Sequence, residues 1–275
     1  MTVATPRPTT RSWTLRLPGG RDLTLGERPR VMGVLNLTPD SFSDGGRWLD
    51  PERALAHALE MIADGADVLD LGAESTRPGG GIYGTGAPPV SADEEWRRLS
   101  PVLTALRRRT DLPLAVDTRR GEVARRALAE GADLINDVSA LGDPATTEAV
   151  AEAGCPVVLM HSRGETATMQ RQAQYGDVVA EVHDELGDAL ERATAGGIAR
   201  EQTVLDPGIG FAKDGGHNLA VLAHLDRLAD LGRPLLVGAS RKAFIGQLAG
   251  GAEPSRRLAG SLAVAIWAVE RGAAM

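Results

Sequence analysis

One lead-in recurs along this chain and constrains its fold more than any other feature. "DGADVLD" (64–70) and "EGADLIND" (130–137) share one form, in which a helix end is followed by Gly-Ala and an apolar strand. "EAGCPVVLMH" (152–161) is a looser copy. Regular alternation of helix and strand is typical of parallel βαβ units.

Short apolar runs mark the expected strands, and they are continuous rather than alternating, as buried parallel strands are. The runs are 31–36, 67–72, 112–117, 133–137, 156–161, 203–206 and 234–238. Helical patterns separate most of them, such as 51–65, 121–131 and 178–197. The first of these begins with Pro51 and stops at Gly65, the usual residues for a helix start and end.

Seven runs are one fewer than the eight strands of a (β/α)8 barrel. The last helical pattern, within 256–275, ends in "RGAAM", which has the lead-in form. We therefore predict an α/β TIM barrel whose eighth strand lies beyond Met275. Residues 12–26 read as a hairpin that covers the bottom of the barrel. We expect a single domain over 1–275, with 1–12 as a flexible arm.

An open doubly wound sheet is the alternative fold, but its usual glycine-rich phosphate loop does not follow the first strand. Aromatic residues make up only 3% of the chain, so the core must be aliphatic. The net charge of -7 argues against nucleic acid as a partner. The single cysteine, Cys155, excludes an internal disulfide and a cysteine-based zinc site. No stretch is long enough to span a membrane, and we expect a cytoplasmic protein.

Polar residues follow the predicted strands, where barrel enzymes place their catalytic groups. Carboxylates and amides can bond the edge of a flat heterocycle, and Lys or Arg can hold an anion. An Asp after a strand is more often a turn or cap residue, which suits Asp70 and Asp137. His161 alone suits a structural histidine. The residues at the strand ends are Asn36, Asp70, Glu74–Arg77, Asp117, Asn136, Asp137, His161, Asp206 and Ser240–Lys242.

Three segments rich in Gly and Pro, or in turn-forming polar residues, are candidates for mobile loops that close over a substrate: 36–52, 74–96 and 206–218. The third is expected to display Phe211 and Lys213 among its glycines.

Seven motifs, in order, resemble the dihydropteroate synthase family. They are "MGVLNLTPDSFSDGG", "DLGAESTRPG", "VDT", "INDVS", "LMH", "DPGIGFAK" and "GASRK". The resemblance implies a dimeric TIM-barrel enzyme of folate biosynthesis. Its reaction condenses 6-hydroxymethyl-7,8-dihydropterin pyrophosphate with p-aminobenzoate, giving 7,8-dihydropteroate and pyrophosphate. It also implies Mg²⁺ as cofactor and sulfonamides as competitive inhibitors.

The resemblance assigns roles residue by residue, with Asp117, Lys242 and Asn36 as the catalytic group. The pterin is expected between Asp117, Asn136, Asp206 and Lys242. Asn36 is expected at the magnesium ion and the pyrophosphate. The aminobenzoate and pyrophosphate side is expected to comprise Thr76, Arg77, Pro78, Phe211, Lys213, Ser240 and Arg241.

Two other functions stay open from the sequence. The family ends with an Arg-x-His strand, which would follow Met275, so a non-catalytic pterin-binding paralogue is an alternative. A pterin-dependent methyltransferase is a third reading, although such an enzyme has no use for "SFSDGG". The last helical pattern, 256–272, is apolar on more than one face, which favours a homodimer contact.

Overall fold

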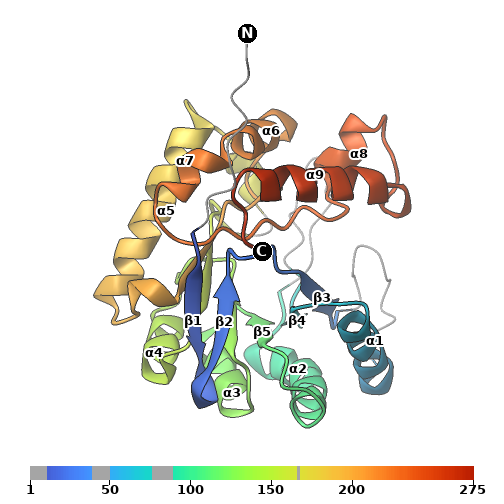
Figure 1. Ribbon diagram of the computed structural model, residues 1–275, viewed down its shortest axis with the longest axis vertical. Coiled ribbons are helices and arrows are strands. Elements are labelled where there is room, and N and C mark those ends of the chain that lie inside the picture. The colour runs from blue at the N-terminus through green and yellow to red at the C-terminus, as the bar shows by residue number, and fades with distance from the viewer. Residues whose placement is uncertain (1–10, 39–49, 76–88, 166–167) are drawn as a thin grey trace.

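The computed structural model of the protein describes residues 11–38, 50–75, 89–165 and 168–275. Figure 1 shows a ring of helices around a central sheet, with α1 on the right, α2, α3 and α4 below, and α5 on the left. Helices and strands follow one another around the ring in chain order, as the repeated lead-in predicts. Of the predicted arm, residues 1–10 lie outside the described residues.

The central sheet is parallel, and its six strands pair in chain order. Each strand lies within one of the predicted apolar runs. The strands are β3 (Met32–Asn36), β4 (Val68–Gly72), β5 (Leu114–Asp117), β6 (Leu134–Asp137), β7 (Val157–Met160) and β8 (Thr203–Asp206). Six of the seven predicted central strands are therefore confirmed as strands.

The seventh predicted strand, 234–238, is reduced to parallel bridges at Leu235, which pairs with Leu205 on one side and Ala273 on the other. Pro234 opens this segment and has no N–H to donate, so the ladder stays short. The expectation that the eighth strand lies beyond Met275 needs correction, because residues 273–275 already pair in its place beside Leu235. The backbone N–H of Val237 donates to Met275 O (2.9 Å), and that of Arg30 donates to Ala274 O (2.9 Å). These bonds close the ring back to the segment before β3.

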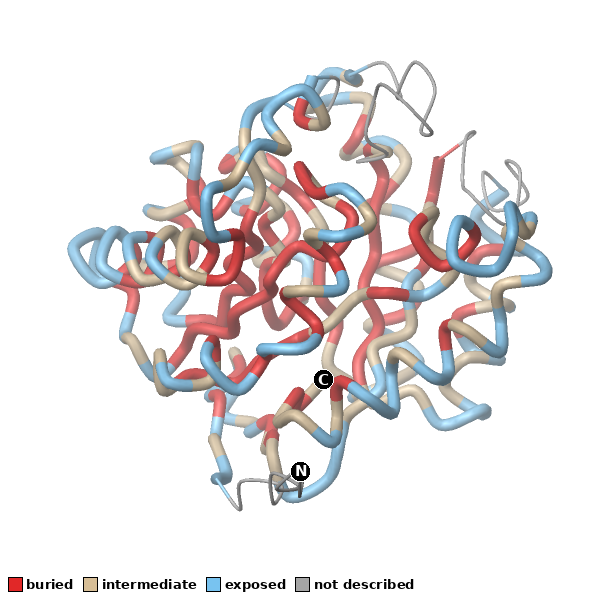
Figure 2. The backbone as a smooth tube through the Cα atoms, turned by 90° about the horizontal axis from the view of Figure 1, so that it is seen from above, coloured by how far each residue is buried: buried red, intermediate tan, exposed pale blue. Residues whose placement is uncertain are grey.

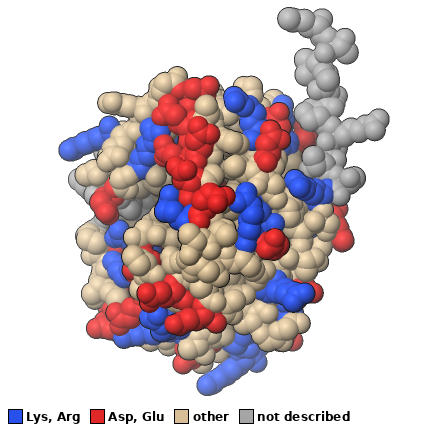
Figure 3. Space-filling model, turned by 90° about the vertical axis from the view of Figure 1, so that its left-hand side faces the viewer, with Lys and Arg blue, Asp and Glu red and all other residues tan. Residues whose placement is uncertain are grey.

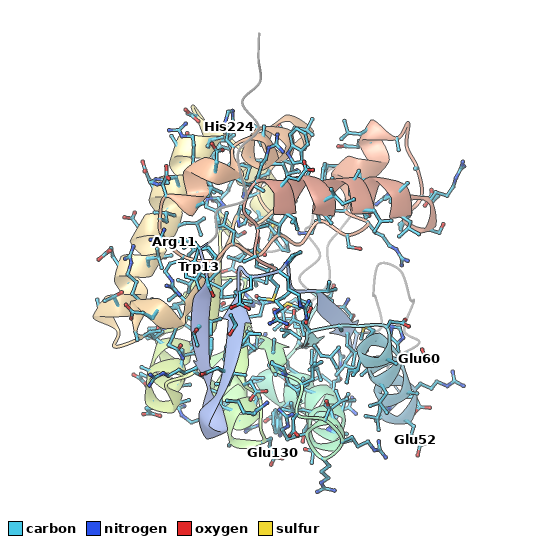
Figure 4. All side chains as sticks on the ribbon, in the orientation of Figure 1. Arg11, Trp13, Glu52, Glu60, Glu130 and His224 are labelled. Carbon is cyan, nitrogen blue, oxygen red and sulfur yellow. The ribbon has the colours of Figure 1, made fainter. Side chains whose placement is uncertain are left out.

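Nine α-helices lie in the described residues, and side chains cap several of their N-termini. Asp50 accepts a hydrogen bond from the backbone of Glu52 at the start of α1, whose Glu52 and Glu60 point outward (Figure 4). Ser91 caps α2 in the same way. The helices are α1 (Pro51–Ala63), α2 (Ala92–Arg107), α3 (Gly121–Ala129), α4 (Pro144–Ala153), α5 (Val178–Ala195), α6 (Gly215–Ala223), α7 (Leu225–Ala229), α8 (Ala243–Leu248) and α9 (Leu258–Glu270).

The predicted hairpin is confirmed as an antiparallel pair, β1 (Trp13–Leu17) with β2 (Arg21–Leu25). Its leucines pack against the inward side chains of the barrel strands, so the hairpin plugs the bottom. Trp13, labelled in Figure 4, donates from its indole N–H to the carbonyl of Gly232 (3.3 Å). The core between the hairpin and the barrel interior comprises Leu15, Leu17, Leu23, Leu25, Val68, Ala115, Leu134, Val158, Val204, Leu236 and Ala274.

A second core joins the outward side chains of the strands to the helices, and Figure 2 shows the buried chain at the centre with exposed helix surface around it. Cys155 belongs to this core, and burial raises the pKa of its thiol to about 12. Within the described ranges, no helix has both the length and the apolar character that a membrane span requires.

Candidate active site

One row of residues crosses four neighbouring strands at their carboxyl ends. The strand register pairs Asn36 with Gly72, Gly72 with Asp117, and Asp117 with Asn136. Side chains alternate along a strand, so residues two positions after the inward Ala115 and Leu134 also face the interior. A Cβ on Gly72 would lie 3.5 Å from Asp117 Oδ2 and 3.6 Å from Asn36 Oδ1. The missing side chain thus leaves a space that both oxygens border.

Asp70 lies inside β4, one layer below this row, and is only 3% exposed. It accepts a hydrogen bond from Asn136 Nδ2 (2.9 Å), and its Oδ1 has no partner among the residues that the structure describes. Burial raises the pKa of Asp70 to about 6, although the Asn136 hydrogen bond opposes the rise. Burial and then the charge of Asp70 raise the pKa of Asp117 well above its ordinary value. The two carboxyls therefore share a site that disfavours two negative charges.

Asp70 was expected to be a turn or cap residue, and the structure corrects this. The sequence signal was its place within "VLDLG", where apolar residues continue on both sides of the Asp. Asp137 does fill the expected turn role, because it accepts hydrogen bonds from the backbone of Ser139 and Leu141 (both 2.8 Å).

Asp206 and Lys242 form the other side of the site. Asp206 ends β8 and accepts a hydrogen bond from the backbone of Gly208 (2.7 Å). Lys242 Nζ lies 4.6 Å from the centroid of the Phe211 ring and donates to the carbonyl of Ile209. Burial raises the pKa of Asp206 and lowers that of Lys242 to about 8, and in each case the partner's charge opposes the shift. Asp206, Phe211 and Lys242 are thus brought together, as the family resemblance implies.

The sequence suggested that Lys213 is displayed on the loop after β8, but its side chain is buried. It is 1% exposed, and its ammonium lies 2.8 Å from His161 Nδ1. It also donates to the carbonyls of Gly208 (3.2 Å) and Phe211 (3.1 Å). A lining role at the aminobenzoate site would therefore be indirect, through the loop that Lys213 holds.

The same loop was expected to be mobile, and its hydrogen bonds argue otherwise. The carbonyl of Gly210 accepts from Gln170 Nε2 (3.1 Å), and that of Ala212 accepts from the hydroxyl of Tyr175 (2.9 Å). Lys213 and Lys242 bond the other three carbonyls of this stretch. Every backbone carbonyl from 208 to 212 therefore accepts a hydrogen bond from a side chain. Gly208 is required here because its φ is +66° and a Cβ would lie 1.8 Å from the carbonyl oxygen of His161.

Ser240 and Arg241 belong to the turn that carries Lys242. Ser240 is exposed, and Arg241 is partly exposed with a left-handed φ of 54°. The backbone N–H of Arg241 donates to Ser261 Oγ (2.8 Å), and its carbonyl accepts from Arg257 (2.9 Å). Contacts from α9 and its start thus hold this strained turn.

Thr76, Arg77 and Pro78 lie outside the described residues, but the flanking residues are fixed. Arg120 bridges the buried Glu74 (2.8 Å) and Glu95 (2.5 Å) and donates to the carbonyl of Val90 (2.6 Å). Glu74 also accepts from the backbone of Val90 (3.3 Å). One Glu–Arg pair therefore holds together the chain just before and just after 75–89.

A signal in the composition points to the two amines. Only two of the 30 basic Lys and Arg residues are lysines, Lys213 and Lys242, and both lie beside Asp206. Arginine serves every other basic position. A buried ammonium that must fit a small space and adjust its charge is a role that arginine cannot take.

The chain is similar to known proteins over most of its length. Residues 32–275 match the family described as "Pterin binding enzyme". The dihydropteroate synthase of Escherichia coli (strain K12) is 46% identical over 245 residues, which cover 89% of this chain and 84% of that protein.

Solved structures of dihydropteroate synthases are similar to this chain over nearly its whole length. The Xanthomonas albilineans dihydropteroate synthase with 4-aminobenzoic acid has a TM-score of 0.86 and 48% identity, covering 96% of this chain and 91% of that one. The same enzyme with 7,8-dihydropteroate has a TM-score of 0.82, 45% identity and coverage of 95% and 90%. The Yersinia pestis enzyme in a sulfonamide complex has a TM-score of 0.88, 43% identity and coverage of 94% and 90%. The TIM-barrel fold is thereby confirmed, and the chain belongs to the dihydropteroate synthase family of pterin-binding transferases.

Proposed function

We propose that this chain condenses 6-hydroxymethyl-7,8-dihydropterin pyrophosphate with p-aminobenzoate to form 7,8-dihydropteroate and pyrophosphate. The observation that carries the proposal is the gathering of Asp117, Asn136, Asp206 and Lys242 around one barrel mouth. Similar enzymes have been captured with 4-aminobenzoic acid and with 7,8-dihydropteroate, one reactant and the product of this reaction.

The pterin binds in the barrel mouth, where Asp206 and Asn136 accept and donate along its amino-pyrimidine edge. Asp117 meets the other ring nitrogens, and Lys242 donates to the ring carbonyl. The support for placing a polar ring here is the bonding capacity that the protein leaves unused one layer below, at the Asp70 partner of Asn136. Asp70 has a buried oxygen without a partner among the described residues, and buried polar atoms normally find one.

The reaction begins as the bond between the pterin methylene and the pyrophosphate oxygen breaks, and the bonding electrons leave with the pyrophosphate. Positive charge then develops on the pterin. The carboxyls of Asp117 and Asp206 lie where they favour that charge, in a buried setting that strengthens electrostatic interactions. The aniline nitrogen of aminobenzoate forms the new bond and releases a proton, so it needs positioning more than a strong base.

Mg²⁺ is part of the proposal, and the donors present suit it. Asn36 Oδ1 borders the space above Gly72, and magnesium binds through one or two protein oxygens together with phosphate oxygens and water. Within the described residues, no group of three or more His, Cys, Asp or Glu could hold a metal ion alone, so the pyrophosphate would supply part of the ligand set. When bound, the ion would neutralise charge on the departing pyrophosphate.

The aminobenzoate lies toward Phe211, whose ring is partly exposed and already faces the Lys242 ammonium. Ser240 and Arg241 complete this side, and the family resemblance adds Thr76, Arg77 and Pro78. Sulfonamides would compete for the same place, and the similar Yersinia pestis enzyme has been solved in a sulfonamide complex.

The test is product formation by the purified protein. Pyrophosphate release and 7,8-dihydropteroate, followed by chromatography and mass spectrometry, should require both substrates and Mg²⁺. Tight pterin binding by calorimetry without turnover would instead identify a non-catalytic paralogue. A pterin-dependent methyl transfer would identify the third reading.

We also propose that α9 forms a homodimer contact. Leu258, Leu262 and Ile266 lie on one face of this helix, spaced by one turn, and are 56%, 56% and 62% exposed. Exposed apolar stripes of this kind usually mark an interface. The protein should sediment as a dimer, and Ile266→Glu should make it a monomer. The cytoplasmic location expected from the sequence stays a prediction.

A further inference from the structure

A chain of three side chains links the buried amine beside the site to the surface of α5. His161 is the residue directly after β7, and its Nε2 lies 3.0 Å from Glu185 Oε2. Its Nδ1 lies 2.8 Å from Lys213 Nζ. His161 and Lys213 are 3% and 1% exposed, whereas the Glu185 side chain is 39% exposed.

The contacts of a protonated Lys213 indicate which ring nitrogen of His161 carries the proton. An ammonium has three donors and no acceptor, and Lys213 has three acceptors around it: His161 Nδ1 and the carbonyls of Gly208 and Phe211. His161 Nδ1 therefore accepts and is unprotonated. The proton lies on Nε2, which donates to Glu185. The protonated amine satisfies every one of these acceptors, and the neutral amine would leave one of them without a donor.

The charges around the relay favour this arrangement. Burial, and then the charge of Lys213, lower the pKa of His161 to about 4, so the ring is neutral. Burial opposes ionisation of Glu185, but hydrogen bonds from His161 and Arg163 lower its pKa to about 2. Burial lowers the pKa of Lys213 to about 7. The charged groups that face Lys213 are Asp206 and Glu185, which raise its pKa, and Lys242 and Arg163, which lower it.

The outer end of the relay reaches a cavity of about 140 Å³. His161 and Glu185 line it, together with Ser139, Ser162, Asp188 and Arg192. Acidic and basic side chains lie side by side on this face of the molecule, which Figure 3 shows. The polar lining of this cavity suits ordered water beside the exposed Glu185 end of the relay.

We propose that Glu185, His161 and Lys213 form a positioning relay that fixes the loop 207–213 and so places Phe211 and Asp206 for the two substrates. The inference rests on the proposed function, because it deepens the role of the same site. Lys213 is a positioning residue, since its amine contacts the loop and not the reacting atoms.

The relay predicts a specific pattern of damage. Lys213→Met keeps a similar length but removes three hydrogen-bond donors. The KM for p-aminobenzoate should rise about tenfold or more, because the backbone carbonyl of Phe211 loses a charged partner. Glu185→Gln should act in the same direction more weakly. Glu181→Gln is the matched control, because Glu181 also pairs with Arg163 (2.7 Å) but does not contact His161.

The decisive experiment needs no catalysis. Because the chain has only two lysines, protein labelled with ¹³C and ¹⁵N on lysine gives two side-chain signals, and a Lys242→Arg variant assigns them. The Lys213 signal should titrate near pH 7, as its lowered pKa requires. Glu185→Gln should move that midpoint to lower pH, and Glu181→Gln should leave it in place. The Nδ1 and Nε2 shifts of His161 should report a neutral ring with its proton on Nε2 at pH 7.

Several results would overturn the relay. These are a Lys213 midpoint near that of a free lysine, equal effects of the two Glu variants, or a proton on Nδ1 of His161. An unchanged KM for p-aminobenzoate in a folded Lys213→Met protein would do the same. If that variant does not fold, Glu185→Gln against Glu181→Gln still decides the question. Absence of turnover in the wild type would instead count against the proposed function, and the titrations would stand independently.

Discussion

The two sides of the site differ in how fully the protein's own residues satisfy their hydrogen-bonding groups. On the side of β8, Lys213 and Lys242 donate to successive carbonyls of the loop, and Asp206 accepts from the backbone N–H of Gly208. On the side of β4 to β6, Asp70 keeps a buried oxygen without a partner among the described residues, and Asp117 is held with a raised pKa.

This difference separates preorganisation from recognition. A loop whose carbonyls are all bonded costs little to order when the substrate arrives. Unsatisfied carboxyl oxygens are costly in the free protein and become satisfied when ring N–H groups of a bound pterin reach them. We therefore expect mutations on the β8 side to act mainly through loop geometry, and mutations on the other side to act through charge and hydrogen bonding.

The largest effect should come from Gly208→Ala. The added Cβ would lie only 1.8 Å from the carbonyl oxygen of His161, and the φ of this residue is left-handed as well. We expect a loss of more than about 3 kcal/mol in the free energy of unfolding, or no folded protein. The matched control is Gly154→Ala, where φ is +60° but nothing lies within 4 Å. That change should cost only about 1 kcal/mol. Equal losses in urea unfolding would show that the close approach to His161 does not matter.

The next effect concerns the carboxylate that the two lysines face. Asp206→Asn removes a buried charge beside Lys213 and Lys242, and the affinity for the pterin pyrophosphate should fall about 100-fold. Calorimetry measures it. Asp214→Asn is the control at the end of the same loop, because Asn caps a helix about as well as Asp and α6 should be unchanged. A pterin affinity that survives Asp206→Asn would contradict the assigned pocket.

A smaller effect should appear in the pH dependence of stability through Asp70. Its pKa in the folded protein is about 6, above the 3.8 expected when unfolded, so the native state binds the proton more tightly. The stabilisation is complete below about pH 4 and is lost as the pH rises through 6. Relative to Asp70→Asn, the wild type should lose on the order of 2 kcal/mol between these limits. Urea unfolding at pH 4, 5, 6 and 7 measures the difference.

Asp64→Asn is the control for that series, because Asp64 is exposed at the end of α1. If the difference between the wild type and Asp70→Asn does not change with pH, the raised pKa is wrong. The acidic side of the site would then be as well satisfied as the β8 side.

Much of this arrangement could be predicted from the sequence, because it depends on local patterns. Continuous apolar runs located six strands, and residues 12–26 read as the hairpin that covers the bottom of the barrel. Polar residues after strands indicated Asn36, Asp117, Asn136 and Asp206, since a parallel barrel brings these ends together.

What the sequence did not predict depends on contacts between distant segments. The glycines around Lys213 indicated an exposed side chain. Its amine is instead buried, because it contacts His161, which lies 52 residues away in the chain. Asp70 looked like a cap residue because its partner, Asn136, lies 66 residues away. The start of the eighth strand at Ala273 is fixed by a bridge to Leu235, which no local pattern reveals.

The smallest effect tests whether the β8 side is held by more bonds than it needs. Tyr175→Phe removes only the hydroxyl that donates to Ala212, and the ring can still lie under the Arg163 guanidinium, whose centre is 4.0 Å from the ring centroid. One neutral hydrogen bond contributes about 1 kcal/mol, so the KM for p-aminobenzoate should rise no more than about fivefold. Gln170→Leu removes the neighbouring bond to Gly210 and should act similarly. If the loop is fixed by several independent bonds, the double variant should lose less than about 0.5 kcal/mol beyond the sum of the two. A much larger loss would mean that these two bonds act as one unit, and that the loop is closer to opening than its hydrogen bonds suggest.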